Sequence, residues 1–252
     1  MELMPIAQLN RFVLRLSGEG LHDWVGGLIT NSLSGDITFA ALLTPQGKII
    51  ADFFVVKDGD DLLIDTPNKF KDDLVKRLKM YKLRAPIMIS ETDLNVFALW
   101  GEQGDEGHID PRHKDLGRRL ITKEDLTAEG DYNAHRLSVG VPDSEWDFAT
   151  QDVFPADANM DLLNGVDFKK GCFVGQEVVS RMKRKTEVRK RMRCFTYEGD
   201  IEGTEIKAGE RVVGKVLHTY DGWGMALLRL DRLASSEEPT MVGDKMTTIR
   251  GG

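Results

Sequence analysis

The chain has few cysteines, and this scarcity limits its chemistry. Only Cys172 and Cys194 occur among 252 residues, too few for a disulfide framework, and a reducing compartment is therefore expected. There is no Cys-x-x-Cys pair and no set of four cysteines, so this chain alone lacks the usual ligands of an iron–sulfur cluster. One cysteine can still supply a single ligand to a cluster that a partner shares.

Long apolar runs are also missing. No stretch of about 18 apolar residues occurs, so the sequence predicts no membrane span. Residues 1–5 show no basic segment followed by an apolar run, and we expect no signal or transit peptide there. We therefore predict a cytoplasmic protein without membrane association.

The balance of charge is acidic, with a formal net charge of −7 at pH 7. An overall negative charge disfavours bulk binding to nucleic acid or to an anionic membrane. Apolar residues make up 41% of the chain and charged residues 30%, which is typical of a folded globular protein. A chain of this length can bury a core without disulfide or metal staples.

Hydrophobic periodicity predicts an α+β fold. The expected strands lie at 11–17, 38–43, 48–57, 61–65, 85–90 and 94–100, and the expected helices at 20–30, 68–82, 123–139 and 175–185. The Asp-Gly-Asp-Asp turn at 58–61 predicts a hairpin. Residues 101–116 are expected to form an exposed loop. The order of elements contains no long series of parallel crossovers, which disfavours a doubly wound sheet.

The pattern changes near 186–190. Short strands with glycine turns are expected at 190–197, 210–218, 223–230 and 245–249, which predicts a small barrel or meander. We therefore divide the chain into a larger region, 1–188, and a C-terminal β-barrel, 189–252.

The segment 169–177, Lys-Lys-Gly-Cys-Phe-Val-Gly-Gln-Glu, is the most unusual in the chain. A strand-like stretch that ends at Gly175 and opens a helix would bring Cys172 close to a helix N-terminus. The helix dipole and the nearby Lys169 and Lys170 would favour the thiolate, which is the form that attacks, is oxidised or binds metal.

The alternative for Cys172 is a structural role, because a lone cysteine in an apolar run is more often a small core residue. The residue pattern alone leaves both interpretations open. Cys194 alternates with Met192 and Thr196 in a strand pattern, and we predict that it belongs to the core.

The run KKGCFVGQEVVSR resembles the signature of the YgfZ family of folate-binding proteins. That family includes a mitochondrial iron–sulfur assembly factor and is related to the aminomethyltransferases of glycine cleavage. The matching positions are Lys170, Gly171, Cys172, Gly175, Gln176, Glu177 and Arg181. Similarity elsewhere covers most of the chain, at Thr30-Asn31, Leu43–Lys48, Asp52, Asp110–Arg112, Leu116-Gly117 and Gly165–Asp167.

The resemblance implies two interleaved ferredoxin-like modules, the inner one at about 46–134, around a central cavity for a tetrahydrofolate-type ligand. The C-terminal barrel would close one side of that cavity. It also implies Cys172 and Asp52 as the catalytic residues and no metal site. The implied folate-binding residues are Asn31, Lys170, Gly171, Gly175, Gln176, Glu177 and Arg181.

The implied function is that of a monomeric, tetrahydrofolate-binding factor that supports iron–sulfur cluster assembly or repair through Cys172. Its partners would be a folate and iron–sulfur assembly or client proteins, with any effect on tRNA modification indirect. The alternative is a folate-dependent aminomethyl or one-carbon transferase with Asp52 as acid or base. The sequence leaves open whether any reaction is turned over.

Two departures from the aminomethyltransferases bear on this choice. Those enzymes carry paired acids where this chain has Ala51-Asp52, and they lack a cysteine at position 172. An acid usually follows the Arg-Leu pair of the pterin-contacting segment, whereas Ser138 stands here. A hydroxyl group lacks the charged acceptor that a pterin amide would use.

Two further clusters of polar residues are candidate sites. Eight basic residues and one acid lie within 181–193, which indicates either a site for an anion or a solvated helix–strand junction. The anion would be a folate glutamate tail, an acidic protein or RNA phosphate, although the run lacks the aromatic residues that stack on bases. His108 and His113 with their acidic neighbours match no standard metal spacing, and we expect a solvated loop.

Overall fold

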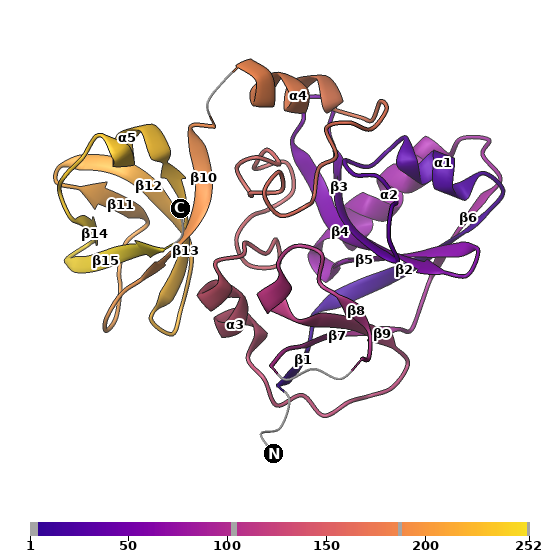
Figure 1. Ribbon diagram of the computed structural model, residues 1–252, viewed down its shortest axis with the longest axis horizontal. Coiled ribbons are helices and arrows are strands. Elements are labelled where there is room, and N and C mark those ends of the chain that lie inside the picture. Colours follow the sequence, from indigo (N-terminus) through magenta and orange to yellow (C-terminus); the bar gives the residue numbers. More distant parts are fainter. Residues whose placement is uncertain (1–4, 102–104, 186–187, 251–252) are drawn as a thin grey trace.

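The computed structural model describes residues 5–101, 105–185 and 188–250. Its larger open sheet has five antiparallel strands in the order β3-β4-β5-β2-β6 (Figure 1). These strands are β2 (Arg11–Gly18), β3 (Ile37–Leu43), β4 (Ile49–Asp58), β5 (Asp61–Pro67) and β6 (Ile87–Glu91). Helices α1 (Leu21–Gly26) and α2 (Lys71–Lys82) pack their buried leucines and valine into the same apolar core on one face of this sheet.

A second sheet has four strands in the order β1-β7-β9-β8. They are β1 (Ile6–Gln8), β7 (Asn95–Leu99), β8 (His108–Ile109) and β9 (Arg118–Thr122). Helix α3 (Tyr132–Val139) follows, and short 3-10 helices lie at Asn68–Phe70 and Lys114–Leu116. The long irregular stretch after α3 leads to α4 (Gln176–Lys185).

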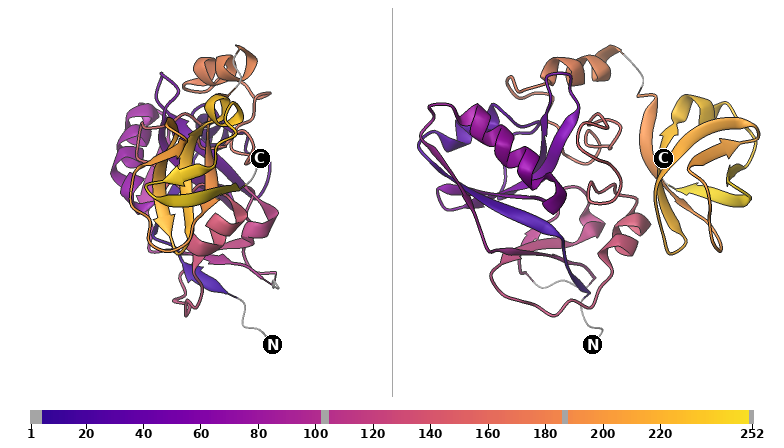
Figure 2. Two further views of the ribbon diagram at one scale, coloured as in Figure 1. Left: turned by 90° about the vertical axis from the view of Figure 1, so that its left-hand side faces the viewer. Right: turned by 180° about the vertical axis from the view of Figure 1, so that it is seen from behind.

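The C-terminal strands close into a barrel in the order β10-β13-β12-β11-β14-β15 (Figures 1 and 2). Its elements are β10 (Lys190–Thr196), β11 (Glu205–Ala208), β12 (Arg211–Tyr220), β13 (Trp223–Arg229), α5 (Leu230–Ala234), β14 (Thr240–Val242) and β15 (Lys245–Arg250). Within residues 188–250, closure of the barrel pairs each strand on both sides and so protects the sheet edges from pairing with another chain.

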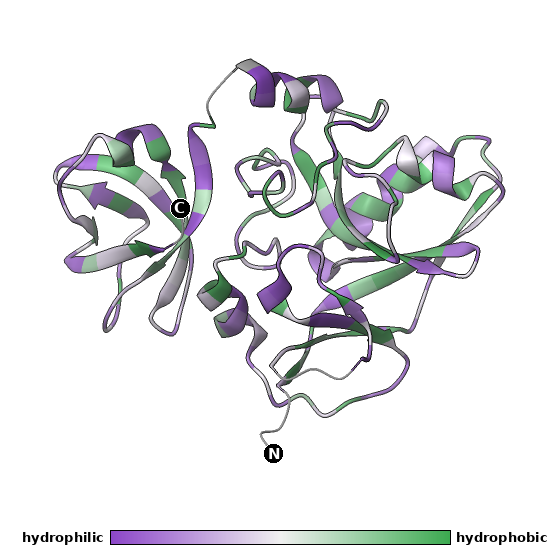
Figure 3. Ribbon diagram, viewed as in Figure 1, coloured by the Kyte–Doolittle hydropathy of each residue, from purple (hydrophilic) through white to green (hydrophobic). Residues whose placement is uncertain are grey.

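One apolar cluster joins the five-stranded sheet to the barrel. Leu43 and Phe54 from the sheet contact the same core as Met160 from the irregular stretch and as Met192 and Met225 from the barrel. Figure 3 shows hydrophilic colouring over most of α4 and apolar colouring along parts of the large sheet. Helix α4 therefore lies across the top of this junction as a mostly polar cover (Figure 1).

The predicted fold class is confirmed, and so is the predicted hairpin. Strands β4 and β5 are antiparallel, with Asp58 opposite Asp61 and Gly59 at a φ of 64°. Strands β1, β8, β9, β11 and β14 and helix α5 are not predicted by the sequence, because segments of two to five residues are too short to show a clear periodicity. The helix expected at 20–30 ends at Gly26. The division of the chain at residue 188 stays a prediction, with the first barrel strand beginning at Lys190.

The helix predicted at 123–139 is wrong over its first half. Asp131 caps α3 by accepting a hydrogen bond from the Ala134 amide at 3.0 Å, so the helix begins only at Tyr132. Just before it, the amides of Glu129 and Gly130 both donate to the Ile6 carbonyl at 2.9 Å. The chain here lies along β1, which prevents an earlier helical turn.

The segment 101–116 is also less exposed than expected, and its residues 102–104 lie outside the described part of the chain. Asp110, Arg112 and Leu116 are buried. Arg112 neutralises Asp110 through a contact of 2.8 Å, so the two charges enter the interior together. In the described residues no helix is long and apolar enough to cross a membrane.

Candidate functional site

The segment that enters α4 exposes Cys172 to solvent. The strand-like stretch expected at 172–174 does not form, and these residues have no regular secondary structure. The next side chain, Phe173, is buried in the core between sheet and barrel. The backbone therefore holds an apolar anchor directly beside an accessible thiol.

The Lys170 side chain points back into the fold, where its ammonium group meets three backbone carbonyls. Its ammonium group donates hydrogen bonds to the carbonyls of Gly26 at 2.6 Å, Ile29 at 2.7 Å and Asn31 at 3.0 Å. Burial lowers the pKa of Lys170 to about 8. These carbonyls occupy its three donors, so the hydrogen bonds seen here go to the backbone, and the predicted roles of Lys170 toward the thiolate and the folate stay predictions.

The Asn31 side chain also makes its hydrogen bonds within the protein. Its side-chain amide donates to the Phe39 carbonyl at 2.9 Å and to the Asn164 carbonyl at 2.6 Å. The neighbouring Thr30 hydroxyl donates to the Gly165 carbonyl at 2.7 Å. These bonds attach the segment before Cys172 to the chain that follows α1.

Gly171 and Gly175 lie on either side of Cys172, and the fold requires glycine at only one of these two positions. Gly175 has a φ of 82°, and a Cβ atom there would lie 2.7 Å from the Thr44 carbonyl oxygen. Only glycine fits this close approach without strain. A Cβ atom on Gly171 would meet no atom within 4 Å among the described residues, so the fold gives no steric reason for glycine at that position.

The remaining predicted residues lie on the first turns of α4. The Gln176 amide approaches the carbonyls of Lys170 and Gly171 at 3.4 and 3.3 Å. Glu177 and Arg181 are exposed. The structure thus brings the predicted motif together around Cys172, with part of it in the interior and part of it facing solvent.

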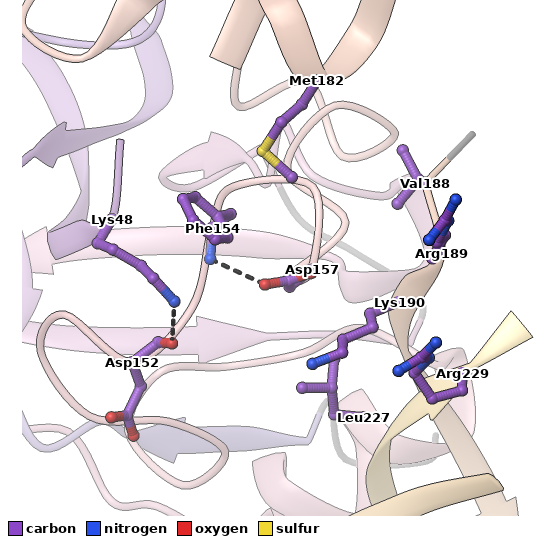
Figure 4. A pocket seen from close by; sticks show the side chains of 10 residues that line it. All are labelled: Lys48, Asp152, Phe154, Asp157, Met182, Val188, Arg189, Lys190, Leu227 and Arg229. Atoms are coloured by element: carbon purple, nitrogen blue, oxygen red, sulfur yellow. Dashed lines mark hydrogen bonds between the residues drawn. The ribbon is translucent and has the colours of Figure 1, made fainter. Parts of the chain in front are cut away.

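A cavity of about 370 Å³ lies under α4, between the irregular segment and the barrel (Figure 4). Met182 of α4 covers it, and Lys48 lies on the side of the large sheet. From the barrel side, Arg189, Lys190 and Arg229 reach its wall. Lys48 and Arg229 were not predicted as members of this site because only the fold brings them to the basic run.

Polar contacts fix one wall of the cavity. The Lys48 ammonium donates to the Asp152 carbonyl at 2.7 Å and lies 4.1 Å from the centre of the Phe154 ring. The Asp157 carboxylate accepts a hydrogen bond from the Phe154 amide at 3.0 Å, and burial raises its pKa. The lining carries four basic and two acidic side chains, but Arg229 is paired with Asp231 at 3.2 Å, so the excess of positive charge is small and comes mainly from Arg189 and Lys190.

A second cavity, of about 280 Å³, adjoins the first, and Met182 and Val188 line both. Lys183 lies over the Phe168 ring at 3.5 Å from its centre. Arg191 forms a two-pronged pair with Asp161, with both contacts at 2.8 Å. The basic run is therefore divided among two cavities, an ion pair and solvent; the side chains of residues 185–187 lie outside the described part.

Asp52 lies in a different environment, in the interior beside a network of buried charges. Its side chain is only 7% exposed and accepts a hydrogen bond from the Ser144 hydroxyl. Burial and the neighbouring Asp143 raise the pKa of Asp52. Asp52 lines neither cavity under α4, and no contact in the described structure joins it to Cys172.

Arg112 is the hub of this network, and no sequence motif indicates that role directly. It donates to Asp110 at 2.8 Å, to Asp143 at 3.2 Å and to the Tyr132 hydroxyl at 2.6 Å. Burial alone would raise the pKa of Asp143, but the charge of Arg112 and of other arginines lowers it to about 2. The network is thus a set of paired, hydrogen-bonded buried charges.

Two other expectations concern single positions. The Ser138 hydroxyl is bonded to the His135 carbonyl of its own helix at 2.7 Å. Cys194 is 1% exposed, and burial raises its pKa to about 11, which confirms its place in the core. Among the described residues, no group of three or more His, Cys, Asp and Glu side chains could hold a metal ion.

Comparison with known proteins relates the chain to iron–sulfur assembly factors. Residues 189–250 match the family model of the CAF17 C-terminal beta-barrel domain. The mitochondrial iron–sulfur cluster assembly factor IBA57 homolog of Pyricularia oryzae is 29% identical over 96% of this chain and 75% of its own length. The homolog of Mycosarcoma maydis is 30% identical over 73% of this chain and 54% of its own length, so the match spans only about half of that relative.

The mouse factor IBA57 is 26% identical over 89% of this chain and 77% of its own length. Among solved structures, the glycine cleavage aminomethyltransferase T of Bartonella henselae matches 99% of this chain and 85% of its own, with a TM-score of 0.79. The sequence identity is 12%, so this likeness shows a shared fold and no more.

These comparisons make one expectation more specific and correct another. The relatives carry the name IBA57, so the resemblance is to that group of assembly factors, to which the YgfZ family is related. The predicted cytoplasmic location is wrong by the same evidence, because these relatives are named as mitochondrial.

Proposed function

We propose that this chain is an iron–sulfur cluster assembly factor whose Cys172 thiolate binds iron of a cluster held jointly with a partner protein. The observation that carries the proposal is the exposure of Cys172 on a segment that is anchored on both sides. Support also comes from the sequence likeness to proteins named as iron–sulfur cluster assembly factors.

The chemistry favours a shared cluster over one bound by this chain alone. Clusters are commonly held by four protein ligands, mostly cysteine thiolates. This chain contains two cysteines, and Cys194 is enclosed in the apolar core. Cys172 can therefore offer one iron–sulfur bond, and the partner must provide the others.

Replacement of each cysteine by serine tests this proposal. In cells depleted of the protein, Cys172→Ser should fail to restore the activity of iron–sulfur enzymes, whereas the matched Cys194→Ser variant should restore it. The amount of folded protein should be the same in both strains by immunoblot. Full restoration by Cys172→Ser would rule out the proposed role.

We further propose a folate as ligand, with its carboxylates in the cationic cavity under α4. Arg189 and Lys190, with Lys48 on the opposite wall, suit the two carboxylates of a glutamate tail, and the apolar cavity walls suit an aromatic ring. Recognition of a pterin ring by residue 138 does not fit, because Ser138 has no charge and its hydroxyl is bonded within α3.

Titration of the purified protein with tetrahydrofolate tests this second proposal. The double variant Arg189→Met/Lys190→Met should bind at least tenfold more weakly, because removing a hydrogen bond to a charged group costs about 1.5 kcal/mol or more. Arg184→Met removes an exposed charge of α4 outside the cavity lining and should bind as the wild type does. Equal affinities in all three proteins would place the ligand elsewhere.

A second candidate function is one-carbon transfer, which the raised pKa of the Asp52 carboxyl favours, since a poised acid suits proton transfer. Against it, Asp52 is sealed in the network. Incubation with tetrahydrofolate and an aminomethyl donor should yield methylenetetrahydrofolate if this function holds, and Asp52→Asn should abolish the product. The absence of product from the wild type would eliminate this candidate.

A further inference from the structure

We infer that Lys170 is a positioning residue, whose ammonium group holds Cys172 in one orientation toward the partner. The inference rests on the proposed role of Cys172. Lys170 lies two residues before the thiol and connects its segment to the turn after α1. It acts through the backbone, and nothing in its geometry requires contact with a cluster or a ligand.

The three carbonyls that it binds come from Gly26, Ile29 and Asn31, at 2.6 to 3.0 Å. Gly26 is the last residue of α1, and carbonyls at a helix end have no partner within the helix. An ammonium group has three N–H bonds in a tetrahedral arrangement, so it can satisfy three converging acceptors at once. The planar guanidinium of an arginine does not offer this geometry.

The same ammonium also contacts the chain beyond the thiol. It lies 5.3 Å from the centre of the Phe173 ring, within the range of a cation–π interaction. Phe173 is buried, and Gly175 is fitted closely against the Thr44 carbonyl. Lys170 thus ties together the residues before and after Cys172, and only Gly171 and Cys172 project from this clamp as exposed residues.

A further set of contacts supports the clamp from the N-terminal side. The Asp167 amide donates to the Thr30 carbonyl at 3.0 Å, and the Ser32 hydroxyl donates to the Asp167 carboxylate at 2.6 Å. These bonds place Lys170 over the carbonyls without involving Cys172. The thiol is therefore exposed but not freely mobile, which lowers the entropy that a partner must remove when it binds.

The properties of Gly171 agree with the proposed positioning of Cys172. This glycine is exposed, and nothing within 4 Å would meet a Cβ atom at this position. The fold does not require glycine at position 171. Because Gly171 has no side chain, the backbone beside Cys172 is open to close approach by a partner protein. The clamp and this bare backbone together present the sulfur without side chains in its way.

A nitroxide spin label on Cys172 tests the inference, in a Cys194→Ala background so that only one thiol reacts. The wild-type label should give a spectrum of restricted motion despite its exposure. Lys170→Met should give a clearly more mobile label, whereas Lys169→Met, which removes an exposed neighbouring lysine, should leave the spectrum unchanged. A freely mobile label in the wild-type protein would overturn the inference whether or not any variant folds.

A second readout separates positioning from stability and from the proposed function. With unlabelled thiol, Lys170→Met should react with a small disulfide reagent at a rate within twofold of the wild type, because exposure is unchanged. Its capture of a cluster-bearing partner should slow at least tenfold. Equal capture rates would contradict positioning by Lys170, while a Cys172→Ser variant that still captures the partner would instead contradict the function of Cys172.

Discussion

The Cys172 segment and the Asp52 network differ in whether their polar groups are exposed to solvent. At Cys172 the neighbouring Phe173 is buried and the thiol faces solvent. In the network the carboxylates themselves are enclosed, and Arg112 is shared between Asp110 and Asp143. The first arrangement leaves a thiol accessible to another molecule, whereas the second satisfies its charges internally.

The difference shows why Asp52 is a weaker candidate for chemistry than its raised pKa suggests. Perturbed pKa values occur in structural ion-pair networks as well as in active sites. Asp52 has a hydrogen-bond donor in Ser144 and is enclosed by charged neighbours. Substitutions in the network should therefore affect stability first, and substitutions around Cys172 should affect function first.

Arg112→Met should cause the largest decrease in stability. It would leave Asp110 and Asp143 buried without their main partner, and breaking a buried pair costs about 3–5 kcal/mol. Urea denaturation measures this change. Arg15→Met breaks the exposed contacts with Asp58 and Asp61 and should cost less than about 1 kcal/mol. Equal decreases in the two variants would show that the buried network has no special energetic role.

Acid should weaken the same network in a defined pH range. The pKa of Asp143 is lowered to about 2 in the folded protein, compared with about 3.9 for an unperturbed aspartate. Its stabilising contribution, about 2.6 kcal/mol, is complete above about pH 5 and is lost as the pH falls through the folded-state pKa near 2. Unfolding free energies of wild type and Asp143→Asn should therefore converge across this range, and parallel curves would contradict the assignment.

The two glycines beside Cys172 should respond differently to alanine. Gly175→Ala forces a positive φ on a residue with a Cβ atom and a close contact with the Thr44 carbonyl, at a cost of about 1–3 kcal/mol. Gly171→Ala should change the unfolding free energy by less than about 0.5 kcal/mol. If Gly171→Ala nevertheless slows partner capture, the open backbone beside the thiol matters for docking, and unchanged capture would argue against that.

Features whose determinants lie close together in the chain could be predicted from the sequence. The Asp58–Asp61 turn, the burial of Cys194 and the helix of α4 follow from local patterns. The partners of Lys170 could not be found in this way, because they are backbone carbonyls more than a hundred residues away. A backbone acceptor carries no sequence signal, so the sequence indicates only that Lys170 lies near Cys172 in the chain and not which groups its ammonium meets.

The cationic cavity escaped prediction for a related reason. Arg189 and Lys190 belong to a visible basic run, but Lys48 and Arg229 reach the same space from the two sides of the molecule. The surroundings of each basic side chain also depend on the fold. Arg191 forms an ion pair with Asp161. Arg184 is exposed and lies outside the cavity lining. A count of basic residues cannot distinguish these cases.

Of the two thiols in this chain, we expect only that of Cys172 to bond to a shared cluster. Native mass spectrometry of the protein mixed with a cluster-bearing partner tests this most directly. We predict a complex that retains iron and sulfide with wild type and with Cys194→Ser, and no such complex with Cys172→Ser. An intact cluster-bridged complex with Cys172→Ser would contradict the role of Cys172 as a cluster ligand.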